Sequence, residues 1–454
     1  MINKNFNRLL IRIIILIPLI LFSAQTYSQT TTTVKHPDWS KNAAIYEVNI
    51  RQFTPEGTFR AFEKHLPELK NLGVDILWLM PINPIGKVNR KGSLGSYYSI
   101  SDYNAVNPEF GTLNDLKKLV NEAHKLGMKV IIDWVANHSS WDNVWTKTHP
   151  DFYSRDDKGN FKPPVDDWTD VIGFNYNHPK LWIAMENAME YWIKECDIDG
   201  FRCDVAGMVQ MPFWNFARKE LIKLKPIFML AEAEGIRFHK HAFDMTYAWE
   251  FHNITKEIYS GKQNVLDLRN YLAKEEKDYN SDAYRMMFTS NHDENSWKGS
   301  VFERYGIAAK TFAVLCGVVK GMPLIYSGQE SGMDKSLRFF DKDTIDWKKS
   351  DFRKIYTVLD DLKNTNKALW NGNYGGEMQL INTDNEKSVF AIYREKDKNK
   401  IVAIFNLSPD EIETTLDSES LKGNYKELFS GKSVSLMNKM TKKLKPWGYS
   451  VYYR

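Results

Sequence analysis

Four short segments of the chain each place a carboxylate beside a histidine, an arginine or a second carboxylate. They read DWVANH (133–138), GFRCD (200–204), LAEAE (230–234) and SNHDEN (290–295). Two carboxyl groups can divide acid–base work, because one donates a proton while the other, ionised, attacks. The sequence has no serine nucleophile motif, no phosphate-binding glycine loop and no Cys/His metal cage. Paired carboxylates are the groups that glycoside hydrolysis requires.

The spacing of Arg202 and Asp204 indicates which carboxylate is ionised. Residues two apart on a strand point to the same side, so the guanidinium would lie beside the carboxylate. A neighbouring cation favours the charged form of an acid, which is the state that a nucleophile needs. One aspartate at the end of a strand is commonly a helix cap. Capping does not account for four such segments, two of them with an adjacent histidine or arginine.

Eight short apolar runs supply the elements that would position these segments. The runs are Ala43–Asn49, Val74–Met80, Lys129–Asp133, Gly200–Asp204, Ile227–Glu232, Ala242–Tyr247, Arg285–Asn291 and Met322–Tyr326. Amphipathic stretches lie between several of them, for example Leu113–Leu126 and Lys180–Lys194. Strands that alternate with helices predict an α/β fold, here a (β/α)8 TIM barrel. The active site of such a barrel lies at the carboxyl ends of its strands, where the four segments would converge.

The length and the hydrophobic pattern of the sequence predict three regions. We expect the barrel to span residues 37–370, since 454 residues exceed one typical core. Residues 138–180 have little helical period and predict a short, loop-rich insertion after the third strand. From 371 to 454, short alternating runs such as Val389–Tyr393 and Ile401–Asn406 predict a C-terminal antiparallel β domain of the sandwich type.

The four segments resemble the four signature regions of the α-amylase family, glycoside hydrolase family thirteen, in the same order and at similar intervals. Three further stretches add to the resemblance. They are GVDILWLMPINP (73–84), similar to the family's second strand, YSISDYNAVNPEFGT (98–112), similar to its stretch with a sugar-stacking tyrosine, and GMPLIYSGQE (321–330), similar to its eighth strand. The likeness covers about Pro37 to Glu330 and is to bacterial secreted α-amylases in particular.

The resemblance implies a role for individual residues. Asp204 corresponds to the nucleophile, Glu232 to the general acid and base, and Asp293 to the carboxylate that holds sugar hydroxyls and stabilises the transition state. The substrate-binding residues that it implies are Tyr98, Asp133, His138, Arg202 and His292. Glu234, two residues beyond the strand end, is expected to be a supporting or solvated carboxylate. The retaining scheme requires ~5–5.5 Å between the two reacting carboxyl groups.

The chain departs from the family after the nucleophile, where many α-amylases carry a Lys-His pair and this sequence reads VAGM (205–208). We therefore expect different recognition on the leaving-group side of the cut. Asn137 matches the family's calcium-ligand asparagine, and Asp170 is a second candidate ligand. A structural calcium is one expectation, and a plain hydrogen bond from Asn137 to the insertion is the alternative. No organic cofactor is expected.

The N-terminus predicts export. Lys4, Arg8 and Arg12 precede the apolar run Ile13–Phe22, as in a secretory signal peptide that we place at residues 1–28. The mature protein would lie in a periplasm or outside the cell, without stable membrane insertion; an uncleaved anchor helix is the alternative. Removing three cationic residues lowers the net charge from +4 to +1, so no nucleic-acid partner is implied. The three cysteines show no metal spacing and are expected to be buried thiols.

Together these features predict an endo-acting hydrolase of the α-amylase type. Its substrate would be an α-glucan such as starch, glycogen or a maltooligosaccharide, cut at α-1,4 bonds through a covalent glycosyl intermediate on Asp204. The same residues serve an exo-acting α-glucosidase, a cyclomaltodextrinase or a transglycosylase, and these alternatives stay open. A non-catalytic glucan-binding protein is a further alternative. The sequence leaves linkage preference, chain-length preference and oligomeric state undecided.

Overall fold

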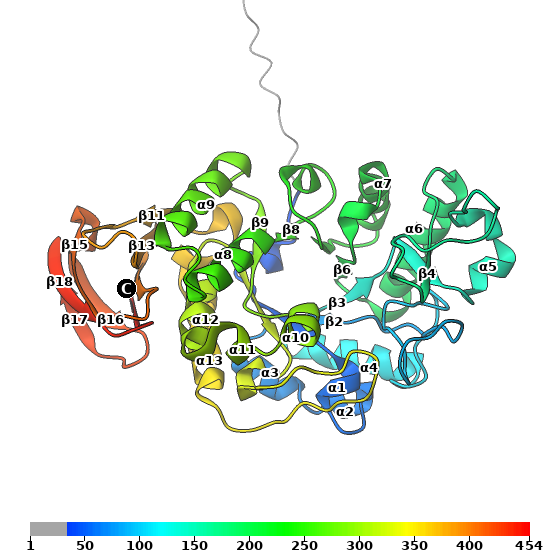
Figure 1. Ribbon diagram of the computed structural model, residues 1–454, viewed down its shortest axis with the longest axis horizontal. Coiled ribbons are helices and arrows are strands. Elements are labelled where there is room, and N and C mark those ends of the chain that lie inside the picture. Colours follow the sequence, from blue (N-terminus) through cyan, green and yellow to red (C-terminus); the bar gives the residue numbers. More distant parts are fainter. Residues whose placement is uncertain (1–33) are drawn as a thin grey trace, which may run out of the picture. The chain divides into compact units, whose positions relative to one another are not determined.

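Eight parallel strands form a closed barrel in the computed structural model, which describes residues 34–454 (Figure 1). The order around the barrel is β1-β10-β9-β8-β7-β6-β3-β2. The strands are β1 (Ile45–Val48), β2 (Ile76–Leu79), β3 (Lys129–Trp134), β6 (Gly200–Cys203), β7 (Phe228–Ala231), β8 (Met245–Tyr247), β9 (Tyr284–Met287) and β10 (Met322–Tyr326). Each predicted run overlaps one of them, which confirms the (β/α)8 fold. The predicted signal peptide, residues 1–28, lies outside the described residues.

Alternate side chains of the strands fill the inside of the barrel. Ile45, Ile76, Ile131 and Leu230 belong to one buried cluster that the strands share. The intervening residues pack outward against the helices, as Phe201 does. This two-residue period places one face of every strand in the core and the other under the helical layer.

Helices between the strands cover the outside of the barrel. They are α1 (Ile50–Phe53), α2 (Phe59–Glu63), α3 (Leu66–Leu72), α4 (Leu113–Lys125), α6 (Pro179–Cys196), α7 (Met211–Leu221), α8 (Trp249–Tyr259), α9 (Val265–Asp278), α10 (His292–Lys298), α11 (Val301–Tyr305), α12 (Ala309–Val318) and α13 (Asp351–Thr365). Helix α4 shows the local cause: Thr112 and Asp115 form a capping box, and the buried face repeats at Leu116, Leu119 and Ala123. Helices α4 and α6 match the two predicted helices.

The insertion after β3 contains little regular structure. Its elements are β4 (His138–Ser140), α5 (Val144–Thr148) and β5 (Val171–Gly173). Strands β4 and β5 pair antiparallel, with His138 opposite Gly173. This pairing returns the chain to the barrel rim, so the insertion begins and ends beside the carboxyl ends of the strands.

The C-terminal region forms two antiparallel sheets, with strand orders β11-β13-β14-β19-β16-β17 and β12-β15-β18. The strands are β11 (Met378–Leu380), β12 (Asn382–Thr383), β13 (Val389–Lys396), β14 (Asn399–Asn406), β15 (Ile412–Asp417), β16 (Gly423–Glu427), β17 (Ser433–Leu436), β18 (Lys439–Leu444) and β19 (Tyr449–Tyr453). One apolar cluster includes Ile404 from the first sheet and Leu416 from the second. The buried Arg394 guanidinium donates to the carbonyl groups of Val318 and Val319 and so ties β13 to the end of α12.

One predicted strand ends earlier than its apolar run suggested. Strand β9 ends at Met287, not at Asn291. The Asn291 side chain instead accepts a hydrogen bond from the Glu294 backbone (2.8 Å) and caps α10. His292 and Asp293 therefore lie in the first turn of a helix, held at the rim by that cap.

The described cysteines, Cys196, Cys203 and Cys316, are all buried and free, as predicted. Within residues 34–454 no helix combines the length and the apolar character that a bilayer crossing needs.

Candidate active site

A cleft of about 520 Å³ lies at the carboxyl ends of the barrel strands. The predicted residues that line it are Tyr98, His138, Asp170, Asp204, Glu232, His292 and Asp293. They come from the loop after β2, the insertion, β4, the ends of β6 and β7, and helix α10. Asp133 and Arg202 are fully buried and line no part of this cleft, so the structure places them beneath it. We refer to this space as the main cleft.

Arg202 lies at the centre of the buried charges. Its Nη1 donates to Asp133 Oδ1 (2.9 Å) and to Asp204 Oδ1 (3.2 Å). Its Nη2 is 2.9 Å from Glu232 Oε2. Strand β6 turns this side chain into the barrel, so one cation faces three carboxyl groups. A single positive charge cannot balance three negative ones in a buried site, and protons must supply the remainder.

The Asp204 carboxyl group holds a proton more readily than the sequence suggested. Burial and the charge of Glu232 raise its pKa well above the ordinary value, although Arg202 lowers it. Burial also raises the pKa of Glu232, although Arg202 lowers it. Arg202 favours the ionised form of Asp204, as the sequence predicts, but burial and Glu232 oppose it. Two acids that share one cation titrate as a pair, so a proton on Glu232 favours the ionised form of Asp204.

The two oxygens of Glu232 have different surroundings. Oε2 accepts a hydrogen bond from the Val205 backbone amide (2.7 Å) and faces the Arg202 guanidinium. Both partners are donors, so they favour a lone pair on Oε2 and leave the proton to Oε1. The backbone of Val205 turns to give this contact, with φ +34° in the left-handed region. A β-branched residue rarely adopts that conformation, which is typical of strained positions at functional sites.

His292 lies between two carboxyl groups. Its Nδ1 lies against Glu47 Oε1, and its Nε2 is 3.2 Å from Asp293 Oδ2. Burial lowers the pKa of His292, but Asp293 and Glu47 outweigh it and raise that pKa well above the usual range. Burial raises the pKa of Asp293, but His292 and Arg202 outweigh it and lower it. The lowered pKa favours the ionised form of Asp293.

His138 is neutral, in contrast to His292. Burial alone lowers its pKa to about 3. Its Nδ1 accepts a hydrogen bond from the Asn137 amide (3.2 Å), so Nε2 carries the hydrogen. That nitrogen is 3.9 Å from Asp204 Oδ2, an oxygen with no hydrogen-bond partner among the described residues. His138 therefore presents an N–H donor to the main cleft.

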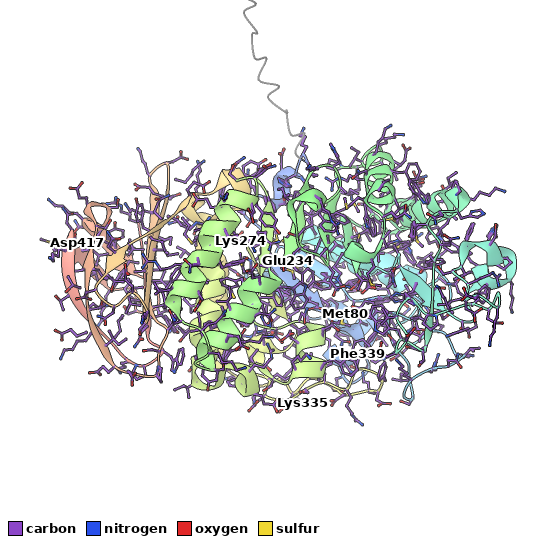
Figure 2. The ribbon with its side chains drawn as sticks, turned by 45° about the horizontal axis from the view of Figure 1, so that its top comes forward. Met80, Glu234, Lys274, Lys335, Phe339 and Asp417 are labelled. Atoms are coloured by element: carbon purple, nitrogen blue, oxygen red, sulfur yellow. The ribbon has the colours of Figure 1, made fainter. Side chains whose placement is uncertain are left out.

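Tyr98 joins the buried network to the cleft. Its hydroxyl donates to Asp133 Oδ2 (3.1 Å), and its ring stacks on His292 with centroids 5.3 Å apart. Its ring is also parallel to Phe339, at 6.2 Å. Phe339, labelled in Figure 2, comes from the loop after β10 and contacts Trp297 at 5.2 Å. These aromatic faces line the wall of the cleft and suit the apolar faces of sugar rings.

A second, smaller pocket of about 300 Å³ borders the main cleft. It is lined by Val205, Gly207, Met208, Glu232, Ala233, Glu234, Arg237, Phe238 and Trp249. Val205 and Glu232 line both spaces, whereas Asp204 lines only the main cleft. Glu234, also labelled in Figure 2, pairs with Arg285 (2.7 Å), which agrees with the expected supporting role. The segment that replaces the family's Lys-His pair thus forms the wall of this second pocket.

Asn137 and Asp170 do not fit a calcium site in this arrangement. Asp170 Oδ1 is 3.1 Å from the Lys91 ammonium, and the Asn137 amide is directed to His138. Calcium takes six to eight oxygen ligands, and a lysine cation beside one of them opposes a second cation. In residues 34–454 no three His, Cys, Asp or Glu side chains form a group that could hold a metal. Calcium dependence stays a prediction, and we assign the ion no role.

Sequence reasoning missed three buried polar partners of the site. Glu47 holds His292, Trp78 donates its indole N–H to Asp133 (3.1 Å), and Tyr247 accepts from Arg202 (3.1 Å). Glu47 had a signal, since a glutamate interrupts an otherwise apolar run. Trp78 and Tyr247 had none, because an aromatic residue at an inward strand position is typical of any barrel core.

Two family models match most of the chain. The family model described as "Alpha amylase, catalytic domain" matches residues 25–172 and 166–406. A second model, "Maltogenic Amylase, C-terminal domain", matches residues 378–451. The two models together span the barrel, the insertion and both C-terminal sheets.

Individual relatives are similar over most of their length. Alpha-amylase 2 of Dictyoglomus thermophilum is 26% identical, covering 87% of this chain and 74% of its own. The maltogenic α-amylase AmyB of Thermotoga neapolitana is 31% identical with a TM-score of 0.83, covering 91% and 99%. An α-amylase of Lactobacillus plantarum is 30% identical with a TM-score of 0.81, covering 92% and 99%. More distant relatives are named as oligo-1,6-glucosidases and as maltosyltransferases, so the names span several activities.

Proposed function

The chain belongs to the α-amylase family of glycoside hydrolases, and from this premise we propose that it cleaves α-1,4-glucosidic bonds with retention of configuration. Its substrate is an α-glucan, and we propose starch, glycogen or maltooligosaccharides. One observation carries the proposal: Asp204, Glu232 and Asp293 line the same cleft above one buried arginine. That arrangement supplies a nucleophile, a proton donor and a fixed negative charge.

In the first step Glu232 protonates the glycosidic oxygen while Asp204 attacks the anomeric carbon. The bond to the leaving sugar breaks, and a glycosyl ester forms on Asp204. The proton leaves from Glu232 Oε1, since Oε2 is held by the Val205 amide. As the proton moves, Arg202 stabilises the new charge on Glu232.

In the second step water attacks the ester from the face that the leaving sugar has vacated. Glu232, now ionised, takes a proton from that water, and Asp204 departs as a carboxylate. The two inversions restore the α configuration. Asp293, ionised beside the His292 imidazolium, accepts hydrogen bonds from sugar hydroxyls and stabilises the positive charge that develops on the ring.

The position of Glu232 supports a proposal for the two sides of the cut. It lines both spaces, as the donor to the bridging oxygen must. Asp204 attacks the sugar that stays bound, so the main cleft takes the glycone side. The second pocket, with Met208 and Trp249, takes the aglycone side.

A product panel tests the proposal. Purified protein is incubated with soluble starch, maltoheptaose, panose and a cyclodextrin, and new reducing ends are measured. Proton NMR at early times shows α-anomers first if configuration is retained. Absence of new reducing ends on every substrate would refute hydrolysis. A dominant transfer product would favour the transglycosylase alternative, and cyclodextrin preference the cyclomaltodextrinase one.

The mode of attack predicted from the sequence, endo action, has less support. The names of similar proteins include several activities, and they do not favour cleavage within the glucan polymer over cleavage at its end. An exo-acting enzyme is the second candidate, and the loops that border the main cleft favour it.

We also propose that the protein is exported. The cationic residues before the apolar run Ile13–Phe22 support it. Intact-mass measurement of protein secreted by a bacterial host should show loss of residues 1–28, and an unprocessed mass would refute cleavage.

A further inference from the structure

The loop of residues 87–95, which follows β2, borders the glycone side of the main cleft. We call it the end loop. Lys91 Nζ lies 3.1 Å from Asp170 Oδ1 and donates to the Asp167 carbonyl oxygen at 3.1 Å. Both partners belong to the insertion after β3. The Lys91 side chain therefore joins the end loop to the insertion.

Hydrogen bonds join the other side of the end loop to the segment after β10. The Leu94 amide donates to the Phe340 carbonyl (2.9 Å), and the Ser93 amide to Asp341 (3.0 Å). Gly92 has φ +63°, and a Cβ there would lie 2.4 Å from Phe340 Cβ. Only glycine permits so close an approach. The end loop is thus connected to the insertion on one side and to the segment 338–341 on the other.

These connections stand on the glycone side of the cut. Lys91, Asp167 and Asp170 line the main cleft, and none of them lines the second pocket. Asp204 lines the main cleft as well. A glucan whose reacting sugar lies on Asp204 would have its further glycone units directed among the end loop, the insertion and the segment after β10.

We propose that Lys91 is a specificity-determining residue that closes the glycone side of the cleft, so that the enzyme takes the non-reducing end of an α-glucan. This inference rests on the proposed function. A chain continuing past this point would have to separate the ammonium from Asp170, whose carboxylate is almost entirely buried. Separating the pair would leave the Asp170 carboxylate, which is 8% exposed, without its cation, so the bridge disfavours longer glycone segments.

The bridge also supplies recognition of the terminal sugar. A lysine ammonium has three N–H donors, and two are directed to Asp170 and Asp167. The third can donate to a hydroxyl of the last glucose unit. The main cleft, at about 520 Å³, lies within the size range of pockets that hold small ligands.

The test compares two maltoheptaoses, one open and one with its non-reducing end blocked by an ethylidene group, and measures the new reducing ends that each yields. Wild-type protein should have a kcat/KM at least tenfold lower for the blocked substrate. Lys91→Met keeps the length of the side chain and removes the bridge, so it should shrink that ratio to less than threefold. Asp170→Asn should do the same and serves if Lys91→Met folds poorly.

Lys87→Met is the matched control, because Lys87 lies in the same loop, is exposed and does not line the main cleft. It should keep the wild-type ratio. Equal cleavage of both substrates by wild type, or an unchanged ratio in both bridge variants, would overturn the inference while hydrolysis itself stands. If wild type cleaves neither substrate, the proposed function fails, and this inference fails with it.

Discussion

Glu232→Gln is the substitution that separates the steps of the proposed reaction. It keeps the volume of the side chain and an oxygen that can accept from the Val205 amide, so the local fold should persist. It removes the proton that leaves from Oε1. A positioned general acid contributes roughly 10²–10⁴ in rate. At about 1.4 kcal/mol per factor of ten, the barrier for an unactivated glucan should rise by about 3–5 kcal/mol.

An activated substrate should escape part of this loss. A dinitrophenyl α-maltooligosaccharide releases its phenolate without protonation, so formation of the glycosyl ester on Asp204 should stay within about tenfold of wild type. Breakdown of the ester still needs a base, and the ester should accumulate as a burst. Azide attacks without a base, so added azide should restore turnover and yield an α-glycosyl azide.

The pH profile gives an independent check. Burial raises the Glu232 pKa, so the protonated, active form persists to higher pH than for an exposed glutamate. Wild-type kcat/KM should fall on the alkaline side as pH passes through that raised pKa, and the glutamine variant should lack this limb. Glu234→Gln, two residues away and paired with Arg285, should keep the limb and show no azide rescue. A loss below tenfold on maltoheptaose, or equal losses on both substrates without rescue, would refute the assignment.

Three further outcomes follow from the contacts. Asp204→Asn should abolish turnover of both natural and activated substrates, and retained activity would remove Asp204 as nucleophile. Burial and Glu232 raise the Asp204 pKa, so ionised Asp204 destabilises the fold at pH values above the usual pKa of aspartate. The Tm of the variant at pH 7 should therefore equal or exceed that of the wild type. Glu47→Gln should lower the His292 pKa, because Glu47 is one of the groups that raise it. Nitrogen NMR at pH 8 should show an imidazolium in wild type and more neutral imidazole in the variant. Identical spectra would contradict the role of Glu47 in raising this pKa. Dialysis against EDTA should leave the Tm within about 2 °C of its value before dialysis, since Lys91 pairs with Asp170. A loss of 1 kcal/mol of stability lowers the Tm by roughly 2–4 °C, and a larger fall would favour a bound calcium.

Local pattern was sufficient for the barrel and for the catalytic candidates. The apolar runs at Ile45–Val48 and Met322–Tyr326 are almost 280 residues apart. Each could be identified alone, because a buried strand appears in the sequence as a short run of apolar residues. The carboxylates could be identified for the same reason. Asp204 and Glu232 directly follow their strands, and parallel strands in a closed barrel bring those ends to one rim.

The charge state of the site could not be obtained in that way. The sequence places Arg202 two residues from Asp204, but not Glu232 or Asp133 on the same guanidinium. The sum of those charges, together with burial, determines where the proton resides. Neither the distance between distant segments nor their burial is a property of the local sequence.

The sequence by itself therefore determined the fold class and the candidates for the reacting carboxylates, since both depend on residue type and period along the chain. Only the tertiary structure decided how the cleft ends and what surrounds it. Lys91, Asp170 and Phe340 come from three separate loops with no shared pattern, and they meet because the barrel brings those loops together. Contacts between loops that are distant in the sequence shape the space that the substrate occupies, and so determine specificity.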